Sequence, residues 1–181
     1  SEIVLDSTDK NGMYKVYDKW PELAHNAYND AETIPPIKNV SHIIFSGMGG
    51  SGTIGDIFSA ILSKSNIHVT VVKGYRLPDI ANENTLVIST SMSGNTNETA
   101  ILLKKSIEKK CKIIAFSSGG KIEKICNENS INHCKVGFIH SPRASLAIVL
   151  FTIMKVLKDI CNLDVDDIEK SWERYFMTFR R

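Results

Sequence analysis

The sequence has 181 residues, of which 43% are hydrophobic, and this is enough for one domain with a substantial core. The 22 Lys and Arg residues nearly balance the 20 Asp and Glu residues, so the formal net charge is only +2. There is no long basic run of the kind that follows a nucleic-acid backbone, and no apolar stretch approaches the roughly 18 residues of a membrane span. We therefore expect a compact cytoplasmic protein that binds neither nucleic acid nor membranes.

The four cysteines form no Cys-x-x-Cys pair and lie inside or beside apolar segments. This pattern favours reduced thiols in the core over disulfides or a zinc site. The histidines are scattered and show no metal-ligand spacing. We expect no metal and no cofactor.

Residues 1–36 are predicted to form a helical preamble. Apolar and aromatic residues recur near helical spacing from Met13 to Ala31, Pro21 permits a break or a new first turn, and the doublet Pro35-Pro36 ends the pattern. The other end of the chain, residues 162–181, is predicted to be a helix from Asp164 to Phe179 that acts either as a terminal helix or as a connector.

The central part, residues 37–161, alternates short β-rich runs with helical segments. The pattern predicts strands at 42–46, 67–72, 85–89, 112–116 and, more weakly, 134–138, and helices at 54–62, 98–109, 120–128 and 142–160. Parallel strands need crossover connections, which are usually helices. The predicted fold is therefore α/β, a doubly wound three-layer sandwich with a five-stranded parallel sheet, whose ligands should bind at the carboxyl ends of the strands.

The first of the expected strand-to-helix loops is rich in glycine. Gly47, Gly49 and Gly52 satisfy the spacing G-x-G-x-x-G, which is found in dinucleotide-binding sites. A dinucleotide site usually also has an acidic residue near the end of the second strand. Residues 71–74 of this chain (VVKG) include no acidic residue. Lys73 or Arg76 could still meet a 2′-phosphate, so an NAD(P) site stays a less favoured alternative.

The second loop, residues 89–99, reads STSMSGNTNET. Ser91, Ser93 and Thr96 place three hydroxyls around one turn, Gly94 allows tight curvature, and the amides that follow are free to donate at a helix N-terminus. Such a loop suits the oxygens of one phosphate monoester, and no P-loop lysine follows the glycines. The alternative is that these side chains only cap a helix.

Four sequence elements together resemble a known family. GMGGSG, SMSGNTNET, SSGGKIEKIC and SPRAS occur in the order found in the SIS (sugar isomerase) domain of bifunctional phosphoglucose/phosphomannose isomerases, from about residue 40 to residue 150. The resemblance implies a flavodoxin-like SIS fold, a phosphorylated hexose as ligand and a homodimer.

The same resemblance implies roles for individual residues. The phosphate-binding hydroxyls fall on Ser51, Ser91, Ser93 and Thr96, and Gly49 and Gly50 line the approach. Arg143, in the PRA element, is the family's candidate for stabilising the developing enediolate, which suits a guanidinium because it is always charged and donates a fork of hydrogen bonds.

The base of an isomerase has no counterpart in this sequence. In the family, the glutamate base and the histidine and lysine that assist ring opening belong to a second SIS domain and a C-terminal segment. Glu98 and His140 are local substitutes, although Glu98 suits a first helical turn and His140 an exposed loop.

Three functional hypotheses follow. The first is an isomerase that interconverts glucose 6-phosphate or mannose 6-phosphate with fructose 6-phosphate, or the phosphate-binding half of one. A close variant is a 6-phospho-3-hexuloisomerase. The third is a sugar-phosphate-binding module without catalysis.

Overall fold

The protein is described by a computed structural model that covers residues 13–139, 141 and 143–179. Five parallel strands form one sheet in the order β2-β1-β3-β4-β5, which confirms the predicted fold class. The strands are β1 (His42–Ser46), β2 (His68–Val72), β3 (Thr85–Ser91), β4 (Lys112–Ser117) and β5 (Asn132–Lys135). The helices are α2 (Met13–Asp18), α3 (Trp20–Asp30), α4 (Gly50–Ile61), α5 (Asn97–Glu108), α6 (Gly120–Glu128), α7 (Leu146–Cys161) and α8 (Asp166–Phe179), with a short 3-10 turn at Leu62–Lys64.

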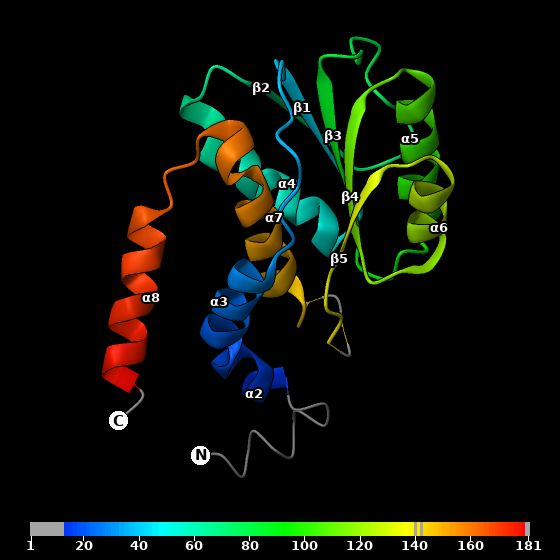
Figure 1. Cartoon of the computed structure of the whole chain (residues 1–181). Helices are drawn as coiled ribbons and strands as arrows, with labels where there is room; N and C mark the ends of the chain where they lie inside the picture. The colour runs from blue at the N-terminus through cyan, green and yellow to red at the C-terminus, as the bar shows by residue number, and fades with distance from the viewer. Residues whose placement is uncertain (1–12, 140, 142, 180–181) are drawn as a thin grey trace.

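Helices cover both faces of the sheet, with α5 and α6 on one side and α3, α4 and α7 on the other (Figure 1). Because successive side chains of a strand point to opposite faces, each central strand contributes to two cores. Phe45 stacks on Phe58 of α4 with ring centroids 5.2 Å apart, whereas its neighbour Ile44 packs with Leu102 and Leu103 of α5. Within the described residues, no helix is long and apolar enough to cross a membrane.

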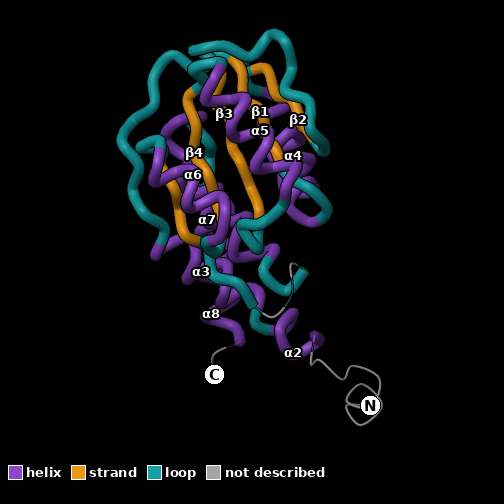
Figure 2. Tube along the Cα trace, turned by 90° about the vertical axis from the view of Figure 1, so that its right-hand side faces the viewer, coloured by secondary structure: helices purple, strands orange, loops and turns teal. Residues whose placement is uncertain are grey.

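The N-terminal helices belong to the same packed body. Pro21 lies in the first turn of α3, at the predicted break, and α3 packs along α7, where Ala24 and Tyr28 are buried. The Trp20 indole N–H donates a hydrogen bond to the Ala144 carbonyl, 3.0 Å away. Trp172 of α8 packs edge-on against Tyr28. In Figure 2, α2, α3 and α8 lie together at the end of the molecule below the sheet.

Several element boundaries differ from the prediction. The third strand continues to Ser91 instead of ending at residue 89, so Ser91 belongs to the rigid sheet. The helix after β1 begins at Gly50 instead of Ile54, because Gly49 adopts a positive φ of 55° and serves as its N-cap. The last strand is displaced toward Asn132, and Gly137 already lies beyond its end. The helix expected from Pro142 begins at Leu146, and Pro142 itself lies outside the described residues.

A buried histidine at the amino end of the sheet, His42, makes stability depend on pH. His42 is 7% exposed, its Nε2 lies 2.9 Å from the Thr70 hydroxyl, and its ring centroid lies 4.9 Å from that of His68. Burial and, secondarily, His68 lower the pKa of His42. The unfolded chain therefore binds more protons than the folded chain once the pH falls below the ordinary histidine pKa of about 6.5.

We expect the free energy of unfolding to decrease as the pH falls from about 7.5 to about 5.5. The His42→Gln variant should show a shallower decrease, because it has no ring to protonate while keeping a polar group near Thr70. Urea unfolding of both proteins at the two pH values measures this difference. Parallel pH profiles would show that His42 does not contribute to the linkage.

Candidate functional site

The strand order reverses between β1 and β3, and this is where open α/β sheets bind ligands. Ser46 at the end of β1 lies opposite Ser89 of β3, and the helices that follow the two strands cover opposite faces of the sheet. The hydroxyls of Ser46 and Ser89 are buried and have no hydrogen-bond partner among the described residues. Polar groups therefore collect at the switch point, directly beneath the loops that follow these two strands.

The loop after β1 brings its backbone close to the start of α4. A Cβ at Gly47 would lie 2.9 Å from Ser51, so only glycine fits this approach. Gly49 is the N-cap of α4, Gly50 is its first residue, and the helix has no side-chain cap. Ser51 is 7% exposed, and its hydroxyl bonds to no other described residue. This first turn therefore offers amides and one hydroxyl to a ligand.

The loop after β3 holds the three other predicted hydroxyls. Ser91 and Thr96 are joined by a hydrogen bond of 2.9 Å between their hydroxyl oxygens, and Ser93 is exposed, with its oxygen accepting a hydrogen bond from the Asn95 amide at 3.3 Å. Thr96 is the N-cap residue of α5 but makes no side-chain capping hydrogen bond. The helix-capping interpretation thus fails for Thr96, and the first amides of α5 are free to meet an anion.

A third loop, after β4, supports the second. Gly94 has a φ of +69°, and a Cβ placed on it would lie 1.7 Å from the Gly119 carbonyl oxygen. The Gly94 carbonyl accepts a hydrogen bond from the Ile122 amide at 3.0 Å, and the Met92 carbonyl accepts one from the Ser118 amide at 3.1 Å. The loops after β3 and β4 are therefore in direct backbone contact.

Lys121 adds a positive charge beside the second loop. Its backbone amide donates to the Asn95 side-chain oxygen at 3.2 Å, and its ammonium group donates to the Asn97 side-chain oxygen at 3.1 Å. No role is predicted from the sequence for the loop after β4, in which Lys121 lies. A signal was available, because Gly119-Gly120 follows a strand and opens a helix just as the glycines of the first loop do.

The groups that could meet a 2′-phosphate are already paired. The Lys73 ammonium lies 2.5 Å from the Asp56 carboxylate, and the Arg76 guanidinium lies 3.6 Å from Asp79. The Lys73 side chain passes beside Gly52 at the start of α4, but its ammonium group is engaged by Asp56. The dinucleotide alternative therefore gains no support from the geometry.

The candidate catalytic residues are not gathered in one place. Arg143 is exposed in the segment after β5, two strands away from β3, and no contact among the described residues joins it to Ser91 or Thr96. Glu98 accepts a hydrogen bond from Tyr75, and this bond raises the pKa of the Tyr75 hydroxyl. The Glu98 carboxylate therefore already has a hydrogen-bond partner. His140 lies outside the described residues.

The cysteines are free, and three of the four are buried. Burial raises the pKa of Cys134 to about 12 and those of Cys126 and Cys161 to about 11, so these thiols are protonated and unreactive at neutral pH. In the described part of the chain, no group of three or more His, Cys, Asp or Glu side chains is arranged to hold a metal ion.

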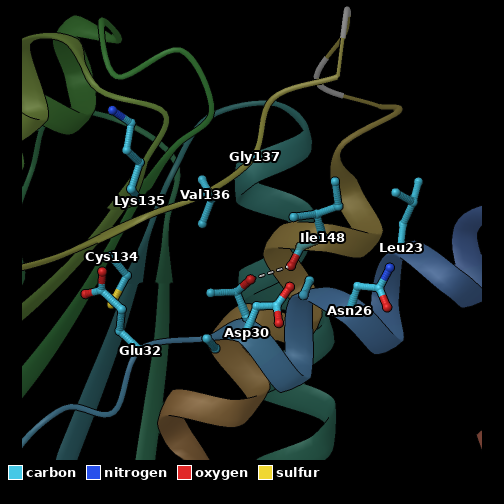
Figure 3. Close-up of a pocket in the computed structure, with 12 residues that line it drawn as sticks. Leu23, Asn26, Asp30, Glu32, Cys134, Lys135, Val136, Gly137 and Ile148 are labelled. Carbon is cyan, nitrogen blue, oxygen red and sulfur yellow. Dashed lines mark hydrogen bonds between the residues drawn. The ribbon is translucent and has the colours of Figure 1, made fainter.

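A pocket of about 290 Å³ lies elsewhere, between α3, the segment Cys134 to Gly137, and α7 (Figure 3). Asp30 and Glu32 line it, and Thr152 donates a hydrogen bond to the Ile148 carbonyl at 2.8 Å beside it. It contains none of the residues predicted from the sequence. The candidate site therefore consists of the loops at the carboxyl edge of the sheet.

Comparison with known protein families agrees with this location. The model of the SIS domain family matches residues 37–154, which is well over half of the chain. The chain belongs to the SIS domain family. The match covers the whole sheet and all three loops described above, and it confirms the family resemblance seen in the sequence.

Individual relatives are more distant. A bifunctional phosphoglucose/phosphomannose isomerase from Caldicellulosiruptor bescii is 30% identical over 138 residues, covering 74% of this chain but 41% of the relative. A D-glucosamine-6-phosphate 4-epimerase from Sulfolobus acidocaldarius is 32% identical over 114 residues, covering 62% of this chain and 35% of the relative. The chain thus spans less than half the length of these curated relatives.

Solved structures share the fold. The NanR protein of Vibrio vulnificus, complexed with ManNAc-6P, aligns with a TM-score of 0.62 and 11% identity, over 97% of this chain and 70% of that one. This SIS fold therefore also occurs in a protein that binds a phosphosugar and whose sequence has diverged widely.

Proposed function

We propose that this SIS domain is the phosphate-binding part of an aldose–ketose isomerase that interconverts glucose 6-phosphate or mannose 6-phosphate with fructose 6-phosphate. The observation that carries the proposal is the pair of hydroxyl-bearing loops at the switch point, with Ser91 and Thr96 joined at 2.9 Å in front of a helix that has no side-chain cap. The proposed substrates are taken from the name of the Caldicellulosiruptor relative, a bifunctional phosphoglucose/phosphomannose isomerase.

The hydroxyls and amides suit a phosphate monoester dianion that must enter and leave the site. Ser51 and Ser93 would each donate one hydrogen bond to a phosphate oxygen, and Gly49 and Gly50 allow close approach. The Ser91–Thr96 pair would donate one more, because the other of its two hydroxyl hydrogens joins the pair. The first amides of α4 and α5 add partial positive charge. Neutral donors hold the dianion with moderate affinity, which is appropriate for a substrate that turns over.

Isomerisation also requires proton transfer between C1 and C2 and a stabiliser for the enediolate oxygen. Arg143 is our candidate stabiliser, because it lies beyond the carboxyl edge of the sheet and its guanidinium is exposed. The base is proposed to come from a second SIS domain or another segment, as the family resemblance implies. Arg143 and the phosphate would then be brought together only in the complete active site.

A coupled assay tests the proposal. The purified chain is given fructose 6-phosphate, and the formation of glucose 6-phosphate and mannose 6-phosphate is followed, with binding measured in parallel by calorimetry. Turnover supports an isomerase, and binding without turnover supports a phosphate-binding half. Absence of binding at millimolar fructose 6-phosphate would contradict the assignment of the site.

Replacement of Ser93 with alanine should weaken the binding of fructose 6-phosphate roughly tenfold, at the low end of the about 1.5–3 kcal/mol that a hydrogen bond to a charged group contributes. Ser93 is exposed, so the loss should not reduce stability. Calorimetric titration of the two proteins checks this, and an unchanged affinity would remove Ser93 from the site.

A phosphosugar-binding module without catalysis is the second candidate function. The engagement of Glu98 by Tyr75 favours it, because the carboxylate that directly follows the second loop already accepts a hydrogen bond. The phosphosugar complex of NanR is a parallel for such a use of the fold. Binding of several hexose phosphates with similar affinity and no turnover would support this alternative.

We also propose that the chain forms a homodimer in the cytoplasm. The proposal rests on the family resemblance, and light scattering tests it directly. A mass equal to one chain at working concentration would contradict it.

A further inference from the structure

The loop after β4 has an anchor of its own. Ser117, the last residue of β4, is fully buried, and its hydroxyl donates to the Gly119 carbonyl at 3.0 Å and accepts from the Gly119 amide at 3.3 Å. Gly119 and Gly120 have φ values of 141° and 72°. Two successive glycines have wide conformational freedom, so the turn takes one shape only where other groups hold it. Ser117 supplies that restraint.

Ser117 is in turn held by the edge strand. The His133 Nε2 atom in β5 lies 2.7 Å from the Ser117 hydroxyl oxygen. A hydroxyl has one hydrogen and two lone pairs, so a Ser117 that donates to Gly119 must accept from His133. This assigns the Nε2–H tautomer to His133. Burial lowers the pKa of His133, but Nε2 carries a hydrogen in the imidazolium form too, so the contact persists on protonation.

The chain of contacts leads to the proposed phosphate site. The turn fixed by Ser117 places the Gly119 backbone directly against Gly94, and the Ile122 amide on the Gly94 carbonyl. Gly94 lies between the phosphate-binding residues Ser93 and Thr96. A displacement of the turn would therefore reorient the hydroxyls that face the ligand.

We propose that His133 and Ser117 are positioning residues of the phosphate-binding loop: they fix the turn at Gly119, which in turn sets the backbone at Gly94. The inference rests on the proposed function, since phosphate affinity is its main measure. Phosphate binding would then depend on two further residues, His133 and Ser117, that touch neither the sugar nor its phosphate. A merely structural role would predict lower stability without a specific loss of affinity.

Three variants and a control separate these two roles. His133→Leu removes the donor, Ser117→Ala removes the acceptor, and His133→Gln restores an amide N–H near the position of Nε2. Ser106→Ala is the control, because Ser106 is equally buried but its hydroxyl donates to Leu102 within α5. Affinities for fructose 6-phosphate and inorganic phosphate are measured by calorimetry, and melting temperatures are measured alongside.

We expect His133→Leu, which loses one hydrogen bond, to bind both ligands about three- to tenfold more weakly. Ser117→Ala loses the hydrogen bonds to Gly119 as well and should bind them at least as weakly as His133→Leu. His133→Gln should bind within about twofold of the wild type, and Ser106→Ala should lose stability but not affinity. Wild-type affinity in His133→Leu, or an equal loss in Ser106→Ala, would overturn the positioning role.

Hydrogen exchange keeps the inference testable without a ligand. In the free protein, the amides of Ser118 and Ile122 should exchange faster in His133→Leu than in the wild type, and His133→Gln should restore protection. If the wild type binds neither ligand, the proposed function fails, while this exchange result still decides whether His133 holds the turn. Unchanged exchange in His133→Leu would overturn the inference.

Discussion

Replacing Gly94 with alanine should lower the free energy of unfolding by about 3 kcal/mol and remove most of the affinity for fructose 6-phosphate. The added Cβ would lie 1.7 Å from the Gly119 carbonyl oxygen, and the φ of +69° disfavours any residue with a side chain. Because the atoms that this Cβ would meet belong to the Gly119 backbone, no side-chain rotation can relieve the overlap. The loops after β3 and β4 must separate, and the hydrogen bond between Ile122 and Gly94 would be lost.

Gly74→Ala is the matched control for this variant. A Cβ at Gly74 would have no atom within 4 Å, so its stability should stay within about 0.5 kcal/mol of the wild type. Urea unfolding and calorimetric titration of the three proteins give both quantities. A Gly94→Ala protein with wild-type stability and affinity would show that the two loops do not need their close contact.

The second large effect is expected at Ser91. Ser91→Ala should weaken the binding of fructose 6-phosphate roughly a hundredfold, near the upper end of the range for hydrogen bonds to charged groups. Ser91 is 1% exposed and belongs to β3, so its hydroxyl is held rigidly and its loss also leaves Thr96 without its partner. The larger effect at Ser91 than at Ser93 follows from this difference in rigidity.

Calorimetry on the single variants and on Ser91→Ala combined with Ser93→Ala measures both contributions. Ser106→Ala again controls for the loss of a buried hydroxyl. A smaller effect at Ser91 than at Ser93 would mean that the buried Ser91 hydroxyl serves the loop and not the ligand.

The sheet could be predicted from the sequence because each central strand is a short β-branched run that ends at a glycine or serine cluster. The placement of both hydroxyl loops at one edge followed from the parallel topology alone. The ends of the strands and helices were harder to predict. Ser91 continues β3 because it pairs with Ser117 of β4, and such pairing is not visible in the local pattern.

The Ser117–His133 contact could not be predicted for a related reason. It depends on the register of β5, in which His133 pairs with Ala115 and Lys135 with Ser117. β5 is a four-residue edge strand with exposed polar residues, so its hydrophobic pattern specifies the register only weakly. The role of Arg143 was inferred from the family resemblance, and no contact among the described residues joins it to Ser91 or Thr96.

The Trp20–Ala144 hydrogen bond bears on how this domain should be trimmed for expression. The family match begins at residue 37, whereas α3 shields the apolar stripe of α7 and tethers the turn that carries Arg143. A truncated protein that begins at residue 37 would lack α3, so the apolar stripe of α7 would be exposed to solvent and the turn would lose its hydrogen bond to Trp20. We expect such a protein to aggregate. We therefore expect the folding unit to start upstream of the family match, at or before Trp20.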